Sequence, residues 1–240
     1  MLIIRILIVV LCILAWLIDV EAKKEPLFVS DANATIRLDQ SVLEGVRLSR
    51  FDSREVYAWL GIPFAKAPVG DLRFRAPRTI KLKSGRFRAQ AFSERCIQIS
   101  TRYDQLLDAI KPGQVIGSED CLYLNVFVPK SALMSKKKLP VMFWIHGGGN
   151  TWGHAGQEMY LPDYFLSQHD VVFVSSNYRL GPLGWFFLEG LNEDSTEPLD
   201  RSANFGTLDL IAALKWVKTH IAAFGGDPDN VTIFGESAGA

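Results

Sequence analysis

The feature that most constrains the fold is a G-x-S-x-G motif, Gly235 to Gly239, which directly follows a short β-branched run, Val231 to Phe234. This order is typical of a nucleophile elbow, a sharp strand-to-helix turn that presents a serine hydroxyl at the top of a parallel sheet. Glycines at the two outer positions remove β-carbons that would meet the neighbouring strand and helix. The pattern predicts that Ser237 is a nucleophile.

The residues before this motif fit the same structural unit. Between residues 208 and 224, apolar side chains recur at steps of three and four and predict a helix: Leu210, Ile211, Leu214, Val217 and Ile221. Turn residues then separate this helix from the strand that leads to the motif, at Asp227 to Asn230. Helix, turn, strand and elbow together predict an α/β fold with a doubly wound, mostly parallel sheet.

Alternating stretches earlier in the chain, at 56–60 and 121–128, predict antiparallel strands that precede the wound sheet. No repeat, low-complexity tract or clear linker interrupts the sequence. We therefore expect residues 23–240 to belong to a single domain.

A second apolar run, Val141 to Ile145, predicts another buried strand, and it ends in His146 and three glycines. Glycines at a strand end let backbone N–H groups turn toward one point, as an oxyanion hole requires. We predict that the amides of Gly148, Gly149 and Ala238 form that hole. His146 stands beside the glycines, where a structural hydrogen bond suits it better than a role as general base.

Together these motifs resemble the type-B carboxylesterases, a family that includes cholinesterases, insect esterases and the non-catalytic neuroligin-like adhesion proteins. The resemblance covers about residues 27 to 240. It rests on segments that occur in the family's order: 61–65 with 68–74, 118–125, 146–149, 177–184 and 224–239.

The resemblance implies an α/β-hydrolase fold and a serine esterase that forms an acyl-enzyme. It also implies a disulfide between Cys96 and Cys121 and a structural salt bridge between Arg73 and Glu119. The triad of this fold runs in the order Ser, acid, His. No acid or histidine follows Ser237 here, and family members are more than twice as long. We therefore expect the sequence to be the N-terminal part of the domain, truncated at the elbow and inactive alone.

Two departures from the family pattern concern specificity. Asn150 follows the three glycines, where the family usually has an aromatic residue, and this favours a more polar acyl pocket. Cholinesterases carry a tryptophan for quaternary ammonium shortly before the segment at 118–122, whereas here the stretch at 109–113 contains Lys111, which would repel a cation. A general, non-cholinergic esterase fits best, and the alternative class is a non-catalytic secreted or adhesion module of the same fold.

The N-terminus indicates secretion. Thirteen consecutive apolar residues, Ile6 to Ile18, follow Arg5, and small residues then lead to Ala22. Residues 1–22 are predicted to be a signal peptide cleaved after Ala22, with an uncleaved anchor as the alternative. The sequons at Asn33 and Asn230 are candidate glycosylation sites in a secreted protein.

Composition limits the partners. The 26 basic and 26 acidic residues balance, which argues against nucleic acid or an anionic membrane as a partner. Two cysteines remain after signal cleavage, so we expect no metal site, and no cofactor is expected either. The expected partner is a small-molecule ester, and the sequence predicts neither the particular ester nor the oligomeric state.

Overall fold

The computed structural model describes residues 28–48 and 55–240, so the predicted signal peptide at 1–22 lies outside the described residues. The strands are β1 (Phe28–Leu38), β2 (Ser41–Leu48), β3 (Val56–Pro63), β4 (Gly85–Arg88), β5 (Gln98–Ile99), β6 (Val115–Ile116), β7 (Tyr123–Pro129), β8 (Leu139–Ile145), β9 (Val172–Ser176) and β10 (Gly226–Gly235). The α-helices are α2 (Arg102–Asp108), α3 (Lys130–Met134), α4 (Asp163–Gln168), α5 (Gly181–Trp185) and α6 (Phe205–His220). Short 3-10 turns are η1 (Gly70–Leu72), η2 (Glu158–Tyr160), η3 (Pro198–Arg201), η4 (Ile221–Phe224) and η5 (Ser237–Gly239).

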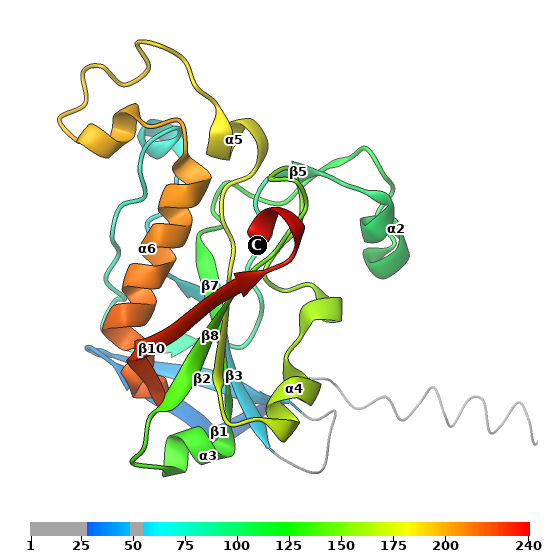
Figure 1. The fold of residues 1–240 in the computed structure, drawn as a ribbon, viewed down its shortest axis with the longest axis vertical. Helices are drawn as coiled ribbons and strands as arrows, with labels where there is room; N and C mark the ends of the chain where they lie inside the picture. The colour runs from blue at the N-terminus through cyan, green and yellow to red at the C-terminus, as the bar shows by residue number, and fades with distance from the viewer. Residues whose placement is uncertain (1–27, 49–54) are drawn as a thin grey trace, which may run out of the picture.

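The main sheet is mixed, with strand order β1-β2-β3-β7-β9-β8-β10, and β4 pairs in addition with β2. Pairing is antiparallel from β1 to β9, whereas β9, β8 and β10 run parallel. Helix α6 covers one face and the short helix α4 lies on the other (Figure 1). The antiparallel N-terminal strands and the parallel strands at the elbow agree with the predicted α/β-hydrolase fold.

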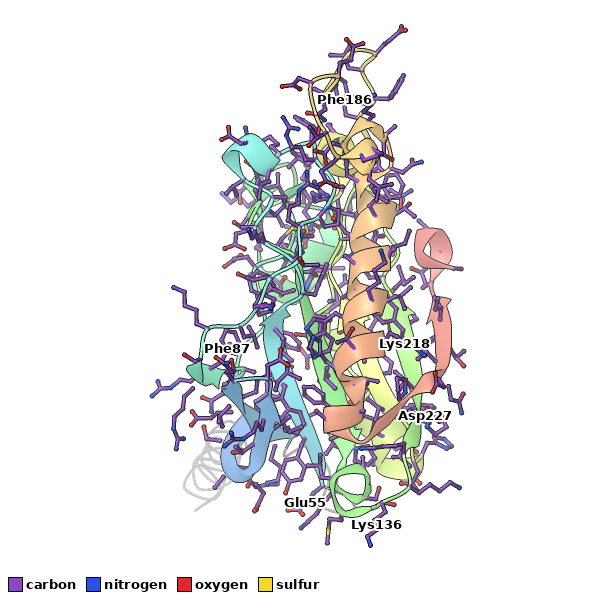
Figure 2. The ribbon with its side chains drawn as sticks, turned by 90° about the vertical axis from the view of Figure 1, so that its left-hand side faces the viewer. Glu55, Phe87, Lys136, Phe186, Lys218 and Asp227 are labelled. Carbon is purple, nitrogen blue, oxygen red and sulfur yellow. A yellow bond between two sulfur atoms is a disulfide. The ribbon has the colours of Figure 1, made fainter. Side chains whose placement is uncertain are left out.

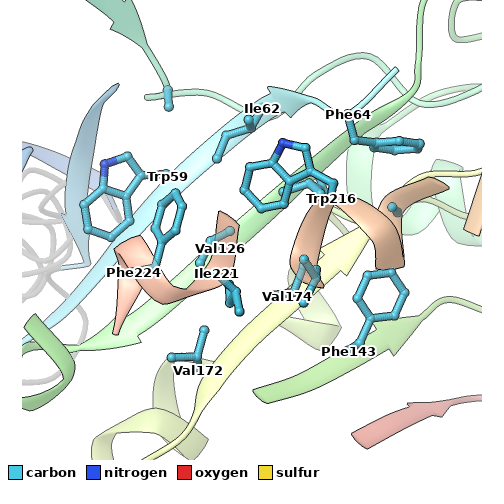
Figure 3. Close-up of a cluster of buried hydrophobic side chains, with 14 of the residues drawn as sticks. Trp59, Ile62, Phe64, Val126, Phe143, Val172, Val174, Trp216, Ile221 and Phe224 are labelled. Atoms are coloured by element: carbon cyan, nitrogen blue, oxygen red, sulfur yellow. The ribbon is translucent and has the colours of Figure 1, made fainter. Parts of the chain in front are cut away.

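Each face of the sheet has its own apolar core. On the α6 side, Trp59 of β3 meets Phe224 edge to face at 5.2 Å, and Trp216 and Ile221 pack beside them (Figure 3). On the α4 side, Leu166 packs with side chains of β2, β3, β7 and β9. Because the central strands are covered on both faces, nearly all of their residues are buried, which differs from the alternation predicted at 56–60 and 121–128.

The apolar face predicted between residues 208 and 224 is largely confirmed, since Val217 and Ile221 are buried and Leu210 and Leu214 pack against the core. Ile211 is 41% exposed, whereas Asp209, Ala213 and Trp216 are buried. Asp209 occupies the buried side because Arg179 donates three hydrogen bonds to its carboxylate, from the backbone N, Nε and Nη2, at 3.0, 2.8 and 2.7 Å. An apolar periodicity cannot detect a buried aspartate whose partner lies in another segment.

The molecule is elongated along the direction of the parallel strands. Phe186, which follows α5, lies at one end of the long axis, while Glu55 and Lys136 lie at the other (Figure 2). Among the described residues, no helix has the length and apolar character needed to cross a membrane.

Candidate active site

Ser237 lies where the sequence pattern places it, on the sharp turn that follows β10. Its backbone φ is +53°, in the left-handed region that non-glycine residues seldom adopt, and the residue is exposed. A Cβ at Gly235 would stand 2.1 Å from the carbonyl oxygen of Gly239, and a Cβ at Gly239 would stand 2.2 Å from that of Ile145. Both glycines are therefore required by close backbone approach, and they hold the strained serine at the surface.

The elbow lies beside the end of β8, the strand that leads into the three glycines. Because β8 and β10 pair in parallel, with Gly235 opposite Ile145, the two strands end at the same edge of the sheet. Contact between the two ends is close, since a Cβ at Gly147 would stand 2.2 Å from Oε2 of Glu236. The backbone N of Glu236 also donates to the Ile145 carbonyl at 3.4 Å.

Residues 146–155, which we call the glycine loop, turn sharply at this edge. The φ angles of Gly148, Gly149 and Asn150 are +104°, +59° and +59°. Within the described part of the chain, no hydrogen-bond acceptor is found for the backbone N–H of Gly148 or Gly149. Amides that are held in place and left without an internal acceptor can stabilise an oxyanion, and the amide of Ala238 follows directly after Ser237.

His146 is buried and makes structural contacts through Nδ1, its ring face and its backbone carbonyl. Its Nδ1 lies 2.9 Å from the Gly147 carbonyl, its ring stacks on Tyr178 with centroids 4.4 Å apart, and the Tyr178 hydroxyl donates to the His146 carbonyl at 2.8 Å. Burial lowers the pKa of His146 to about 4, although the contact with Gly147 opposes this shift. The contacts of Nδ1 and of the ring fix the loop, and among the described residues Nε2 is buried with no hydrogen bond to Ser237.

Among the described residues, no hydrogen bond joins any of the other three histidines to Ser237, and Nδ1 of His154 accepts from the backbone N of Gly156 at 3.2 Å. Burial, followed by the charge of Arg95, lowers the pKa of His154 to about 4. His169 follows the end of α4 and His220 is the last residue of α6, so both lie next to the segments that lead into the amino ends of β9 and β10. That edge of the sheet is opposite the one that carries Ser237. Within residues 28–48 and 55–240, no group of three potential metal ligands is brought together.

The structure joins the two pairs that the family resemblance implied. Cys96 and Cys121 form a buried disulfide with their Cα atoms 5.0 Å apart. Arg73 binds Glu119 in a two-pronged ion pair, with Nε to Oε2 at 2.6 Å and Nη2 to Oε1 at 2.7 Å. The ion pair connects the residue after η1 to the segment that leads into Cys121, and neither contact involves the elbow.

The two candidate glycosylation residues are both exposed. Asn33 lies on β1 and Asn230 lies on β10. Either side chain is therefore accessible for modification.

Several supports of the glycine loop were not predicted from the sequence. Asn177 accepts a hydrogen bond from the backbone N of Ala155 at 2.8 Å and donates to the Cys121 carbonyl at 3.1 Å. The amide of Gln98 binds the backbone of Gly153. Such partners lie 22 and 55 residues apart, so no local pattern can reveal them.

In the part of the chain that the structure describes, the candidate site does not coincide with a large cavity. A hollow of about 700 Å³ lies between α6 and the turn that joins β1 to β2, and its lining does not include Ser237 or the glycine loop. The backbone geometry of the elbow is the stronger indicator here.

The fold and the elbow define an esterase-like α/β hydrolase, and comparison with known proteins specifies the family. The sequence model of the carboxylesterase family matches residues 32–240. The chain belongs to the carboxylesterase family.

Individual relatives with similar sequences are also esterases. The chain is 45% identical to para-nitrobenzyl esterase of Bacillus subtilis (strain 168) over 188 residues, which cover 77% of this chain and 35% of that protein. It is 41% identical to acetylcholinesterase of Danio rerio over 201 residues, 82% of this chain and 30% of that protein. A solved carboxylesterase structure from Geobacillus stearothermophilus aligns with a TM-score of 0.68 at 39% identity, covering 86% of this chain and 39% of that one. The chain thus spans about a third of the length of its curated relatives.

Proposed function

We propose that the complete protein is a serine carboxylic-ester hydrolase in which Ser237 is the nucleophile. The observation that carries this proposal is the strained, exposed Ser237, with φ +53°, at the same sheet edge as the glycine loop. A positive φ alone does not single out this serine, since Asp39 in the β1–β2 turn has the same value of +53°; the position of Ser237 directly after β10 and beside the end of β8 does. The names of the relatives, which include para-nitrobenzyl esterase, support the same chemistry.

The proposed reaction proceeds in two stages. The Ser237 oxygen attacks the ester carbonyl carbon, and the carbonyl oxygen becomes an oxyanion held by the amides of Gly148, Gly149 and Ala238. A histidine beyond Ala240, oriented by an acid also beyond Ala240, takes the serine proton and passes it to the departing alcohol as the ester C–O bond breaks. Water then attacks the acyl-enzyme and releases the acid.

Replacing the proposed nucleophile tests this function in the complete protein. We expect Ser237→Ala to abolish hydrolysis of p-nitrophenyl acetate and covalent labelling by a fluorophosphonate probe, because the attacking oxygen is gone. Ser84→Ala is the matched control, since Ser84 is also exposed but lies in the loop before β4. Both variants should be secreted normally. Wild-type turnover in Ser237→Ala would contradict the proposal, and a wild-type protein that neither turns over nor labels would favour the non-catalytic adhesion class.

We further propose that the substrates are neutral esters rather than choline esters. No tryptophan lies between Cys96 and Cys121, and the exposed Lys111 in that segment disfavours a cationic substrate. The complete enzyme should show a kcat/KM for a neutral thioester at least about tenfold higher than that for acetylthiocholine, which corresponds to roughly 1.4 kcal/mol of discrimination. Similar values for the two substrates, together with tight inhibition by a quaternary ammonium ion, would instead assign a cholinesterase.

Secretion is also part of the proposal. The Cys96–Cys121 disulfide supports an oxidising compartment, because such bonds seldom persist in the cytosol. The exposed side chains of Asn33 and Asn230 are consistent with glycosylation after signal cleavage behind Ala22. N-terminal sequencing and enzymatic deglycosylation of protein from the culture medium test both points.

A further inference from the structure

We propose that Gln98 is a positioning residue for the oxyanion hole. Gln98 belongs to the segment closed by the Cys96–Cys121 disulfide, and its side chain fixes the conformation of the glycine loop. Gln98 lies two residues after Cys96 and is 5% exposed. Its Oε1 accepts from the backbone N of Gly153 at 2.8 Å, and its Nε2 donates to the Gly153 carbonyl at 2.9 Å. Nε2 also donates to the Cys96 carbonyl at 2.9 Å, so one side chain joins the two segments.

The contacts of Gln98 add to hydrogen bonds within the loop, in which the backbone N atoms of Thr151 and Trp152 donate to the Gly148 carbonyl. Gly148, Gly149, Asn150 and Gly153 all have positive φ angles. Glycine-rich backbone in this region has many alternative conformations of similar energy, so an external contact helps to select one of them. A buried side chain that satisfies both polar groups of one peptide residue can make that selection.

The contacts continue from Gly153 to the predicted oxyanion donors. A Cβ at Gly153 would stand 2.5 Å from Nδ1 of His146 and 2.7 Å from the Gly147 carbonyl oxygen, so the backbone of Gly153 packs against the start of the loop. Trp152 donates to the Gly148 carbonyl at 3.1 Å. A shift of Gly153 would therefore displace the amides of Gly148 and its neighbour.

A second contact from the same segment supports the loop. The ring of Tyr103, on α2, stacks on Trp152 with centroids 5.3 Å apart and an interplanar angle of 12°. Helix α2 is itself anchored, because Thr101 and Asp104 form a capping box and Arg95 makes ion pairs with Asp104 and Asp108. Gln98 and Tyr103 thus hold adjacent residues of the glycine loop from one anchored segment.

The consequence for catalysis is specific, and this part of the inference rests on the proposed function. Loosening Gly153 should leave ground-state binding of an ester nearly intact but should misalign donors that act on the oxyanion. Misplacement of such donors by about 1 Å costs on the order of 100-fold in rate. The expected signature is a fall in kcat with little change in KM.

The test uses the complete protein with Gln98→Met, which keeps the side-chain length and removes both polar groups. Gln90→Met is the matched control, since the half-buried Gln90 donates a single bond, from Nε2 to the Gly45 carbonyl at 3.3 Å, and none to the loop. With p-nitrophenyl acetate we expect Gln98→Met to lower kcat about 10- to 100-fold, with KM within about threefold. Gln90→Met should stay within about twofold of wild type on both parameters.

Hydrogen–deuterium exchange of the peptide covering 146–155 gives a readout that does not need activity. Exchange should accelerate in Gln98→Met and remain at the wild-type rate in Gln90→Met. If Gln98→Met is not recovered folded, Tyr103→Leu serves instead, because Tyr103 is half exposed; it should lower kcat about 2- to 10-fold and accelerate the same exchange.

The outcomes separate this inference from the proposed function. An unchanged kcat, with or without faster exchange, overturns the positioning role, as does a rise in KM that accounts for the whole loss. If the wild-type protein hydrolyses no ester, the proposed function fails, and exchange alone decides whether Gln98 sets the loop.

Discussion

At the scale of single residues, the glycines of the site fall into two physical classes. Gly235 and Gly239 are required because a Cβ would collide with backbone atoms, and Gly148 belongs with them, since its Cβ would stand 2.0 Å from the Trp152 carbonyl oxygen. Gly149 differs, because the nearest atom to its Cβ would be Oγ1 of Thr151 at 4.0 Å. Its requirement for glycine is conformational, through a φ of +59°.

Because a side chain at position 149 would meet no close atom, a substitution there tests the proposed oxyanion hole without a steric collision. We expect Gly149→Val to lower kcat of the complete enzyme about 100- to 1,000-fold, because a β-branched residue leaves the left-handed region and turns the donor away. Gly70→Val is the matched control, since Gly70 has a similar φ of +55° and open space around its Cβ. In both variants the left-handed backbone conformation should lower the free energy of unfolding by about 1–2 kcal/mol. Only Gly149→Val should also lose turnover with p-nitrophenyl acetate. Equal kcat values in the two variants would remove Gly149 from the hole.

Residue-scale prediction from the sequence succeeds where a motif carries its own geometry. The motif at 235–239 predicts the elbow, because the close approach of Gly235 and Gly239 to backbone is built into the turn. Gln98 and Tyr103 could not be predicted in the same way, since their partners are brought close only by the tertiary fold. Asp209 likewise appears polar in the sequence and is buried because Arg179 binds it.

At the scale of elements, one buried carboxylate ties the loop before α6 to the loop that follows β3. The side chain of Asp200 is fully buried and accepts hydrogen bonds from Arg78, Arg75, Ser195 Oγ and the Ala76 backbone N, at 2.6, 3.2, 2.6 and 2.9 Å. Burial alone would raise the pKa of Asp200, but these hydrogen bonds, with that from Arg78 the largest, together lower it to about 2. The carboxylate therefore remains charged and paired at neutral pH.

Neutralising this carboxylate should destabilise the protein measurably. We expect Asp200→Asn to lower the free energy of unfolding by about 3 kcal/mol, because two arginines lose their buried partner. Asp229→Asn is the control, since its ion pair with Lys218 is exposed, and it should cost less than about 1 kcal/mol. Urea denaturation of the complete protein, monitored by tryptophan fluorescence, measures both. Equal losses in the two variants would show that Asp200 does not support this junction.

Urea denaturation at lower pH tests the direction of the pKa shift of Asp200. Because the folded pKa of Asp200 is lowered, its stabilising contribution is present above the unfolded value of about 4 and is lost as the pH falls toward 2. The difference in stability between wild type and Asp200→Asn should therefore shrink across that range. A difference that stays constant down to pH 2 would assign the effect of the substitution to packing.

Element-scale prediction works where a strand is apolar along its length and weakens where it is short and polar. The continuous apolar run at 141–145 predicts β8, and the stretch at 56–60 predicts part of β3, although its five residues are all buried rather than alternating in burial. The parallel pairing of β4 with β2 was not predicted, because β4 is a short strand of mostly exposed residues with no apolar pattern. The start of α6 at Phe205 was missed for a related reason, since the helix begins with Phe205 and Gly206 buried against the loop that follows β9.

At the scale of the whole molecule, β10 is the last strand in the order of the sheet, and within residues 28–48 and 55–240 no strand pairs with its other side. Ile233 on this strand is 53% exposed. Beside it, a hollow of about 210 Å³ on the sheet face is lined by Met142, Trp144, Phe165, Phe173, Phe234 and neighbouring side chains. An exposed apolar edge strand next to an apolar hollow favours pairing with further chain.

This geometry yields a prediction for residues 23–240 produced alone. The serine hydroxyl is a poor nucleophile until a positioned base takes its proton. His146 is enclosed by its own loop, Nδ1 of the half-buried His154 accepts from the Gly156 backbone N at 3.2 Å, and His169 and His220 lie at the opposite edge of the sheet. We therefore expect this segment to show no significant turnover of p-nitrophenyl acetate, apart from weak residual activity from an oxyanion hole, and to associate through β10.

The comparison that decides this prediction is between the segment and the complete protein at equal concentrations of folded chain. Light scattering should show association of the segment, and Ile233→Lys should reduce it, because a charge on an edge strand opposes pairing with a second copy. Activity of the segment equal to that of the complete protein would show that a base for Ser237 lies within residues 23–240. The triad order assumed for this fold would then be wrong for this chain, and His146 and His154 would become the first residues to replace.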